Sequence, residues 1–240
     1  MRILAAGIAS LALAGCSSTE DKAAEFVDEG SKAFEAKGLE VSAVNTSVEV
    51  RDAEIVRATN GTAAIVTLRN KDARPLQKVP IALDVADAAG KSIWKNDTSG
   101  LQTSLVAVPV LAVGANTVWI NNQVLPVTGT AATVKVRVGA AKPAPAALPK
   151  ITVSPPELEG DPVDGVAARG ELSNDSKVEQ KELVVYGLAR KDGKVVAAGR
   201  AIVPRVRAQT KARYAIFFIG DPRGAALEVS APPTTLPGEG

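Results

Sequence analysis

Histidine is absent from this chain of 240 residues, and cysteine and methionine each occur once. Histidine is the commonest general base and the commonest metal ligand, so its absence excludes Ser–His–Asp and Cys–His catalysis as well as Cys/His zinc or copper sites. A single cysteine cannot form a disulfide within the chain. These absences favour a protein that is not an enzyme and that holds no cofactor.

Aromatic residues make up only 3% of the chain, whereas hydrophobic residues as a whole make up 46%. We therefore expect packed cores built from Val, Ile, Leu and Ala, and the frequency of valine in short runs favours strands over helices. The formal net charge is +2. A nearly neutral chain has no overall attraction for nucleic acid, so no nucleic-acid partner is expected.

The first residues have the features of an export signal. Arg2 supplies a positive charge, and residues 3–14 form an uncharged apolar run. This run has the length of a signal-peptide core but falls short of the roughly 20 residues that span a bilayer as a helix. Residues 1–15 are therefore predicted to be a signal peptide that is removed from the mature protein.

The apolar run ends in the string Leu-Ala-Gly-Cys at residues 13–16, which resembles the lipobox of bacterial lipoproteins. The resemblance implies cleavage between Gly15 and Cys16, a diacylglycerol on the sulfur of Cys16, and a further acyl chain such as palmitate on the new amino group. Two or three acyl chains on one residue anchor a protein stably. The expected partner is thus a membrane, either the cell membrane or an outer membrane, with the protein facing outside the cytoplasm. Ser17 takes the place of the aspartate that retains such proteins at the inner membrane.

Periodicity divides the rest of the chain. Helical spacing over residues 16–38 predicts a lipidated N-terminus followed by a short helix, and a period of two begins at residue 39. Residues 139–150 are rich in proline and alanine and predict an interdomain linker. We expect an all-β fold: two small immunoglobulin-like β-sandwiches in tandem, 39–138 and 151–230, followed by a disordered tail at 231–240.

The spacing of motifs predicts that the second sandwich repeats the first. Residues 67–70 (Thr-Leu-Arg-Asn) match residues 171–174 (Glu-Leu-Ser-Asn), and a glycine followed by lysine occurs 20 residues after the first asparagine and 19 after the second. The first copy contains extra residues around 96–104. Later in each copy a strand contains an aromatic residue, Trp119 or Tyr214. Counting back from the glycines superposes Ile81, Leu83 and Val85 on Val184, Tyr186 and Leu188.

Asn174, the strand through Tyr186, the turn at residues 191–196 and the strand at 214–217 together resemble FxLYD-type domains. These are small immunoglobulin-like modules of bacterial surface and secreted proteins. The resemblance covers most of the second sandwich and, more faintly, the first. It implies a packing and turn pattern, and it implies no catalytic residues.

Four basic residues share the parity of one strand face near the end of the second sandwich. On an unbroken strand they would form a stripe that meets anionic lipid headgroups, teichoic acid or acidic glycans. The alternative is the solvent face of an edge strand, where charge prevents aggregation between sheets. These candidate contacts are Arg205, Arg207, Lys211 and Arg213.

Two further groups are weaker candidates for ligand binding. Trp94 and Trp119 offer aromatic platforms, although core packing is the alternative for both. A turn-rich acidic loop supplies oxygen ligands of the kind that Ca²⁺ requires, but its spacing is not that of an EF-hand, and solvated turn residues are the alternative. The acids are Glu157, Glu159, Asp161 and Asp164.

The pattern favours a non-catalytic, membrane-anchored envelope lipoprotein that binds another envelope protein or a polymer, or that acts as a scaffold or spacer. The alternative is a lipoprotein carrier or substrate-binding protein for a small ligand or lipid, which requires a concave apolar pocket. A hydrolase would require two carboxylates that converge in a cleft. A tight Val/Ile/Leu core without a deep pocket favours the first of these functions.

Overall fold

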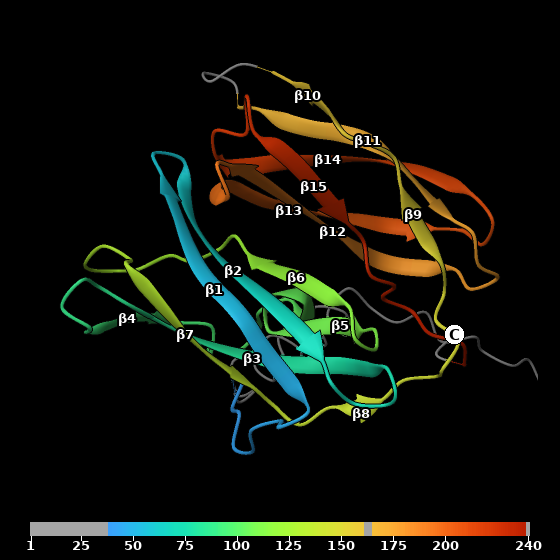
Figure 1. Ribbon diagram of the computed structural model, residues 1–240, viewed down its shortest axis with the longest axis horizontal. Coiled ribbons are helices and arrows are strands. Elements are labelled where there is room, and N and C mark those ends of the chain that lie inside the picture. Colours follow the sequence, from blue (N-terminus) through green and yellow to red (C-terminus); the bar gives the residue numbers. More distant parts are fainter. Residues whose placement is uncertain (1–37, 161–164, 239–240) are drawn as a thin grey trace, which may run out of the picture. The chain divides into compact units, whose positions relative to one another are not determined.

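The computed structural model describes residues 38–160 and 165–238 (Figure 1). Residues Lys37–Gly240 form one compact unit, and the predicted all-β sandwich fold is confirmed. The predicted signal peptide, the lipidation residue Cys16 and the short helix before residue 38 lie outside the described residues. Within the described ranges no helix is both long enough and apolar enough to cross a bilayer.

The first half of the unit contains two antiparallel sheets. Three strands have the order β1–β2–β6, and a second sheet has β3 at its centre, paired with β4, β5, β7 and β8. A short 3₁₀ helix, η1, precedes β5. The elements are β1 (Val48–Ala58), β2 (Gly61–Asn70), β3 (Leu76–Ala86), β4 (Ser92–Lys95), η1 (Thr103–Leu105), β5 (Ala107–Leu111), β6 (Asn116–Asn121), β7 (Thr133–Val138) and β8 (Lys142–Pro143).

The second half has the strand order β10–β11–β14–β13–β12–β15, with β9 also paired to β11. Strand β14 pairs with β11 along most of its length and with β13 only at residues 218–220, so it connects the two sheets of this sandwich. The strands are β9 (Ile151–Val153), β10 (Glu157–Glu159), β11 (Ala167–Asn174), β12 (Gln180–Lys191), β13 (Lys194–Val206), β14 (Lys211–Gly220) and β15 (Ala226–Ser230).

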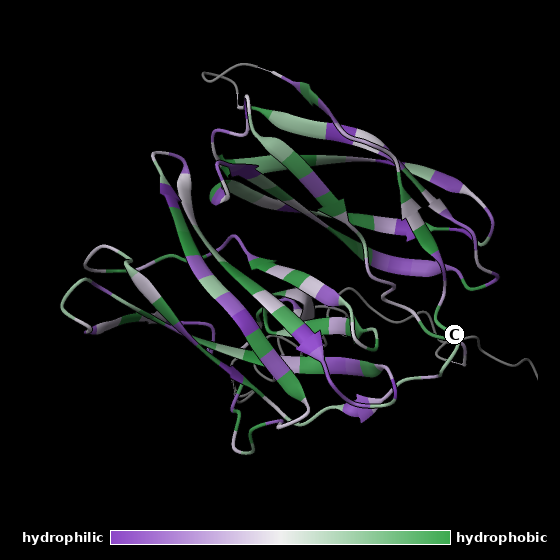
Figure 2. Ribbon diagram, in the orientation of Figure 1, coloured by the Kyte–Doolittle hydropathy of each residue, from purple (hydrophilic) through white to green (hydrophobic). Residues whose placement is uncertain are grey.

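Side-chain alternation builds the core, as the period of two predicts. In β3 the residues Val79, Ile81, Leu83 and Val85 are at most 2% exposed, whereas the residues between them reach the surface in part. The same alternation gives the green and purple bands along β1 in Figure 2. Strand β2 departs from it, because its residues 63–66 are buried on both faces.

The internal repeat is present in the structure, and one buried asparagine marks it in each half. Nδ2 of Asn70 donates to the carbonyl oxygens of Arg74 (2.9 Å) and Leu111 (3.2 Å). Nδ2 of Asn174 donates in the same way to Val178 (2.9 Å) and to Val206 (3.2 Å). Each side-chain oxygen accepts the backbone N–H of the residue two positions on. Both amides therefore satisfy backbone groups where the chain passes from one strand to the next.

The expected superposition of Ile81, Leu83 and Val85 on Val184, Tyr186 and Leu188 is wrong by one residue. Counting from the asparagines, Lys78 corresponds to Glu182, and both have a positive φ, 49° and 47°. Each lies opposite a proline in its ladder. The ladder partners of residues 77 and 79 flank Pro109, and those of residues 181 and 183 flank Pro204. Residue Val185 therefore corresponds to Ile81. The one-residue difference between the copies falls near the end of β12, at the bulge between Ala189 and Arg190, and a slip of one residue exchanges the two faces of a strand.

The extra residues of the first half replace a continuous strand. In the second half β13 runs unbroken beside β12, whereas the first half has β4, a loop with η1, and then β5. The side chain of Asn96 bridges the break: its Oδ1 accepts the N–H of Leu83 (2.7 Å), and its Nδ2 donates to Ile81 O (2.8 Å) and Leu105 O (3.0 Å). The buried amide thus replaces ladder hydrogen bonds that a strand would supply.

Two segments are more ordered than expected. The predicted linker at 139–150 contains β8, and Ala144 within it is buried and donates its N–H to Pro75 O at 2.7 Å. In the predicted disordered tail, residues 234–236 instead contact Gln180 at the start of β12 and a small apolar cluster with Val110 and Ala144. Oε1 of Gln180 accepts the backbone N–H groups of Thr234 and Thr235, and Leu236 is 2% exposed. A buried glutamine amide holds this segment without any strand pattern.

Candidate functional site: the junction between the two halves

Strand β2 is buried on both faces over residues 63–66, because the second half packs against the outer face of the sheet β1–β2–β6. The inner face of this sheet, with Trp119 and Leu68, contributes to the core of the first half. The same hydrophobic cluster includes Val184, Tyr186 and Leu188 of β12. The opposite face of β12 contributes to the separate core of the second half. Two sandwiches thus share an apolar junction.

One arginine forms the polar centre of this junction. Arg200 on β13 is 9% exposed and donates from all three guanidinium nitrogens to first-half side chains. Its Nη2 donates to Gln102 Oε1 (2.7 Å), its Nη1 to Ser104 Oγ (2.7 Å), and its Nε to Asn122 Oδ1 (3.2 Å). All three acceptors are neutral. Burial lowers the pKa of Arg200 below its ordinary value, and the arginine remains charged at neutral pH. We call these four residues the Arg200 clamp.

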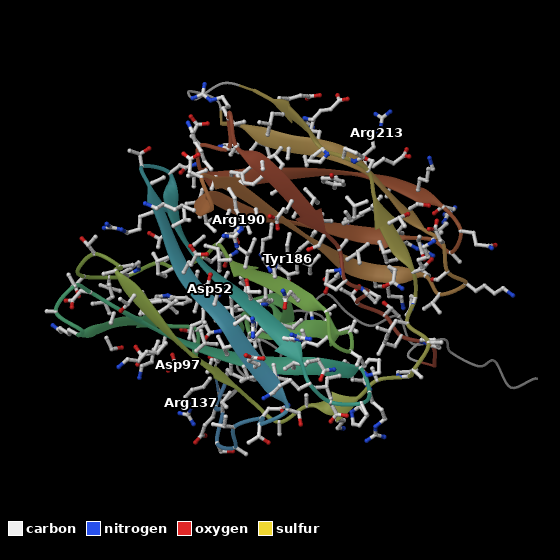
Figure 3. All side chains as sticks on the ribbon, in the orientation of Figure 1. Asp52, Asp97, Arg137, Tyr186, Arg190 and Arg213 are labelled. Carbon is white, nitrogen blue, oxygen red and sulfur yellow. The ribbon has the colours of Figure 1, made fainter. Side chains whose placement is uncertain are left out.

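The residue that lies across from Arg200 in the ladder is Tyr186. It is 1% exposed, and its hydroxyl oxygen is buried without a hydrogen-bond partner among the described residues. Burial raises the pKa of Tyr186 far above its ordinary value, and the nearby charge of Arg200 opposes this only in part. In Figure 3, Tyr186 and Arg190 both lie on the side of β12 that faces the first half.

Polar contacts at a second position also connect the halves. Arg190 at the end of β12 lies 3.5 Å from Glu54 on β1 and 3.7 Å from Glu228 on β15. Burial, followed by the neighbouring Asp52, raises the pKa of Glu54, and Arg190 counters this. At the β1–β2 hairpin, Asn60 Nδ2 donates to Phe218 O at 2.8 Å. The junction is therefore fixed at several separate points.

Two solvent-open grooves flank the apolar contact. The first has a volume of about 480 Å³ and is lined by β6 of the first half and by β9, β12 and β15 of the second. The second has a volume of about 390 Å³ and lies beside the Arg200 clamp, between residues 101–109 and the strands β12 and β13. Both are lined by a mixture of polar and apolar side chains, which suits recognition of a polypeptide or polar ligand better than storage of a lipid.

The four basic residues that were candidates for one stripe do not share a strand. Strand β13 ends at Val206, and a turn separates it from β14. Arg205 forms an ion pair with Glu179 at 2.9 Å, and Lys211 forms one with Glu171 at 2.7 Å. The hydrogen bond that Lys211 donates to Glu171 raises the pKa of Lys211. Arg207 lies in the turn, and Arg213 is exposed on β14 (Figure 3). The four side chains are therefore brought near one hairpin, and the condition for a single stripe, an unbroken strand, is not met because the turn interrupts it.

The remaining candidates take ordinary structural positions. Glu159 on β10 forms an ion pair with Arg169 at 2.6 Å, while Asp161 and Asp164 lie outside the described residues. Across the described part of the chain, no three acidic or thiol side chains gather as a metal site would require. The indole of Trp119 is fully buried and donates to Ser104 O at 3.0 Å, and Trp94 packs against the same core.

Sequence reasoning missed the residues of the junction. Arg200 interrupts an otherwise apolar strand, Val-Val-Ala-Ala-Gly-Arg-Ala-Ile-Val, which is a signal for a buried, specifically paired charge. The sequence shows that the first half has extra residues. It does not show that these residues and η1 contain Gln102 and Ser104, which accept hydrogen bonds from Arg200 of the second half. No protein-family model matches the chain, and no curated protein matches it.

Proposed function

We propose that the protein is a lipid-anchored component of a bacterial envelope that acts without catalysis, as a rigid two-sandwich module that binds or positions another envelope protein or polymer. The lipobox-like string that ends at Cys16 supports the anchor. The single observation that supports the rigid module is the junction, in which a shared apolar cluster and the Arg200 clamp fix one sandwich against the other.

Rigidity matters for such a role because a flexible tandem would lose part of its binding free energy in ordering its two halves. The open, mixed lining of both junction grooves favours this function over the carrier function, for which an enclosed apolar cavity would be needed.

The anchor is tested by expressing the full chain with and without Cys16→Ala in a bacterial host. We expect the natural chain to begin at Cys16, to have the added mass of its acyl chains, and to sediment with membranes. The variant should accumulate as precursor of the mass predicted from its sequence. If the natural chain is recovered in the soluble fraction with residues 1–15 intact, the proposal is wrong.

A further inference from the structure

The segment after β15 runs past the start of β12, and we call its residues 231–236 the strap (Figure 1). Gln180 is 0% exposed at this position, and its amide binds the backbone of the strap. Its Oε1 accepts the N–H groups of Thr234 (2.9 Å) and Thr235 (3.1 Å), and its Nε2 donates to Thr235 O (3.0 Å). A buried amide that uses both its donor and its acceptor in this way fixes the position of the strap.

Hydroxyl groups of the strap take the place of ladder hydrogen bonds. Strand β15 pairs with β12 only over residues 186–190 of β12, and residues 232–233 are prolines, which have no N–H to donate. Beyond them, Thr234 Oγ1 donates to Lys181 O (2.7 Å), and the N–H of Lys181 donates to Thr235 Oγ1 (3.1 Å). Valine or alanine at these two positions could make neither contact.

One leucine anchors the strap in an apolar pocket. Leu236 is 2% exposed and packs with Val110 of β5, with Ala144 and with the partly buried Leu148, in a cluster separate from both sandwich cores. The first half and the segment that follows it therefore form the leucine pocket, whereas Gln180 of the second half binds the backbone.

The first half has an equivalent segment at the equivalent place. Strand β7 is followed by β8, which returns along the start of β3 and pairs with Leu76 and Gln77. Counted from the two asparagines, these residues correspond to Gln180 and Lys181. Backbone pairing holds β8, whereas the strap has no strand pairing in the described part of the chain and is held by side chains. The start of β12 remains paired with β13 on its other side, so the strap can dissociate without disrupting a sheet.

We propose that the start of β12 is a binding site for a Thr-Thr-Leu peptide segment preceded by proline, that the strap is its resident ligand, and that a segment of the same chemistry in another polypeptide displaces the strap. The inference rests on the proposed binding role and gives its partner a chemistry. The contacts involve backbone amides, two hydroxyls and one leucine, and none of them requires a segment of the same chain. A tethered ligand has an effective concentration in the millimolar range, so the partner must exceed this competition through its affinity or its local concentration.

The test uses the full-length lipidated protein in detergent and a fluorescently labelled peptide of residues 231–240. Leu236→Asp places a charge in the apolar pocket and should detach the strap. By fluorescence anisotropy we expect the peptide to bind this variant with a dissociation constant of about 100 µM, and to bind the natural chain at least about tenfold more weakly because the strap competes. Pro237→Asp is the matched control: Pro237 is exposed, so this variant should bind the peptide as weakly as the natural chain.

The amide of Lys181 reports on the same site independently, because its N–H donates to Thr235 Oγ1. Thr235→Val keeps the shape of the strap and should speed hydrogen exchange at Lys181 by about fivefold, as should Leu236→Asp. The natural peptide at about 1 mM should restore slow exchange in Leu236→Asp. A peptide with valine in place of both threonines should bind Leu236→Asp at least about tenfold more weakly than the natural peptide.

Four results would each overturn the proposal: no peptide binding to folded Leu236→Asp, equal affinity for this variant and the natural chain, equal affinity of the threonine and valine peptides, or unchanged exchange at Lys181 in both variants. If circular dichroism shows that Leu236→Asp does not fold, Thr235→Val replaces it in every measurement and should bind the peptide about threefold more tightly than the natural chain. None of these outcomes bears on the lipid anchor, which the processing of Cys16→Ala tests separately.

Discussion

Replacing Arg200 by alanine removes three hydrogen bonds between the halves of the protein. Hydrogen bonds to charged groups contribute about 1.5–3 kcal/mol each. Their sum overstates the loss, because Ser104 and Asn122 are partly exposed, Gln102 is exposed, and all three can be rehydrated. The variant also avoids the cost of burying a guanidinium without a carboxylate partner. We expect the free energy of unfolding to fall by about 3 kcal/mol.

Urea unfolding measures this change, with the fluorescence of buried Trp119 as a reporter beside the clamp. A double-mutant cycle with Gln102→Ala should give a coupling free energy of about 1–2 kcal/mol. Arg205→Ala is the matched control, because Arg205 is an exposed arginine on the same strand with an ion pair to Glu179; it should cost less than about 1 kcal/mol. If Arg200→Ala costs no more than Arg205→Ala, and no coupling is found, the clamp does not stabilise the junction.

Three further predictions follow from buried or paired side chains. Tyr186→Phe removes a buried hydroxyl without a partner and should raise the free energy of unfolding by about 1 kcal/mol. Because burial raises the pKa of Tyr186, the stability of the wild-type protein should also decline above pH about 10, where the phenol of the unfolded chain ionises. The stability of the variant should decline less over the same pH range. Asn174→Ala leaves backbone carbonyls unsatisfied and should lower the urea midpoint by an amount equivalent to about 3 kcal/mol; a change below a third of this would contradict its role. Hydrogen bonds from Arg223 hold the pKa of Asp221 at about 2, so its stabilisation is present above the ordinary aspartate pKa and is lost as pH falls toward 2, and Asp221→Asn should reduce the fall in melting temperature between pH 4 and pH 2.

The all-β fold could be predicted because each level of the sequence agrees with it. Alternation in β3 and β7, glycine turns between strands, and an asparagine at equivalent positions of the two copies all indicate the same architecture. The match between Trp119 and Tyr214 is also confirmed: Trp119 pairs with Val66, and Tyr214 pairs with Gly170, at equivalent ladder positions. Both aromatic side chains pack in a hydrophobic core, as the alternation along their strands predicts.

The junction could not be predicted in the same way. Burial on both faces makes β12 a continuous apolar run, Leu-Val-Val-Tyr-Gly-Leu-Ala at residues 183–189, and such a run does not show which face belongs to which core. The register error had a different cause. The one-residue difference between the copies lies at the bulge between Ala189 and Arg190, so counting back from the glycine of the following turn shifts every residue before the bulge by one. The contacts of Arg200 depend on a loop about a hundred positions earlier in the chain, and no local pattern records that distance.

The central claim is that the two sandwiches form one cooperative unit through their junction, and differential scanning calorimetry of the whole chain tests it most directly. We predict a single transition in which the calorimetric and van't Hoff enthalpies agree. Two separate transitions, or a van't Hoff enthalpy near half the calorimetric value, would contradict the claim. Either result would indicate two sandwiches that unfold independently and are joined by a linker.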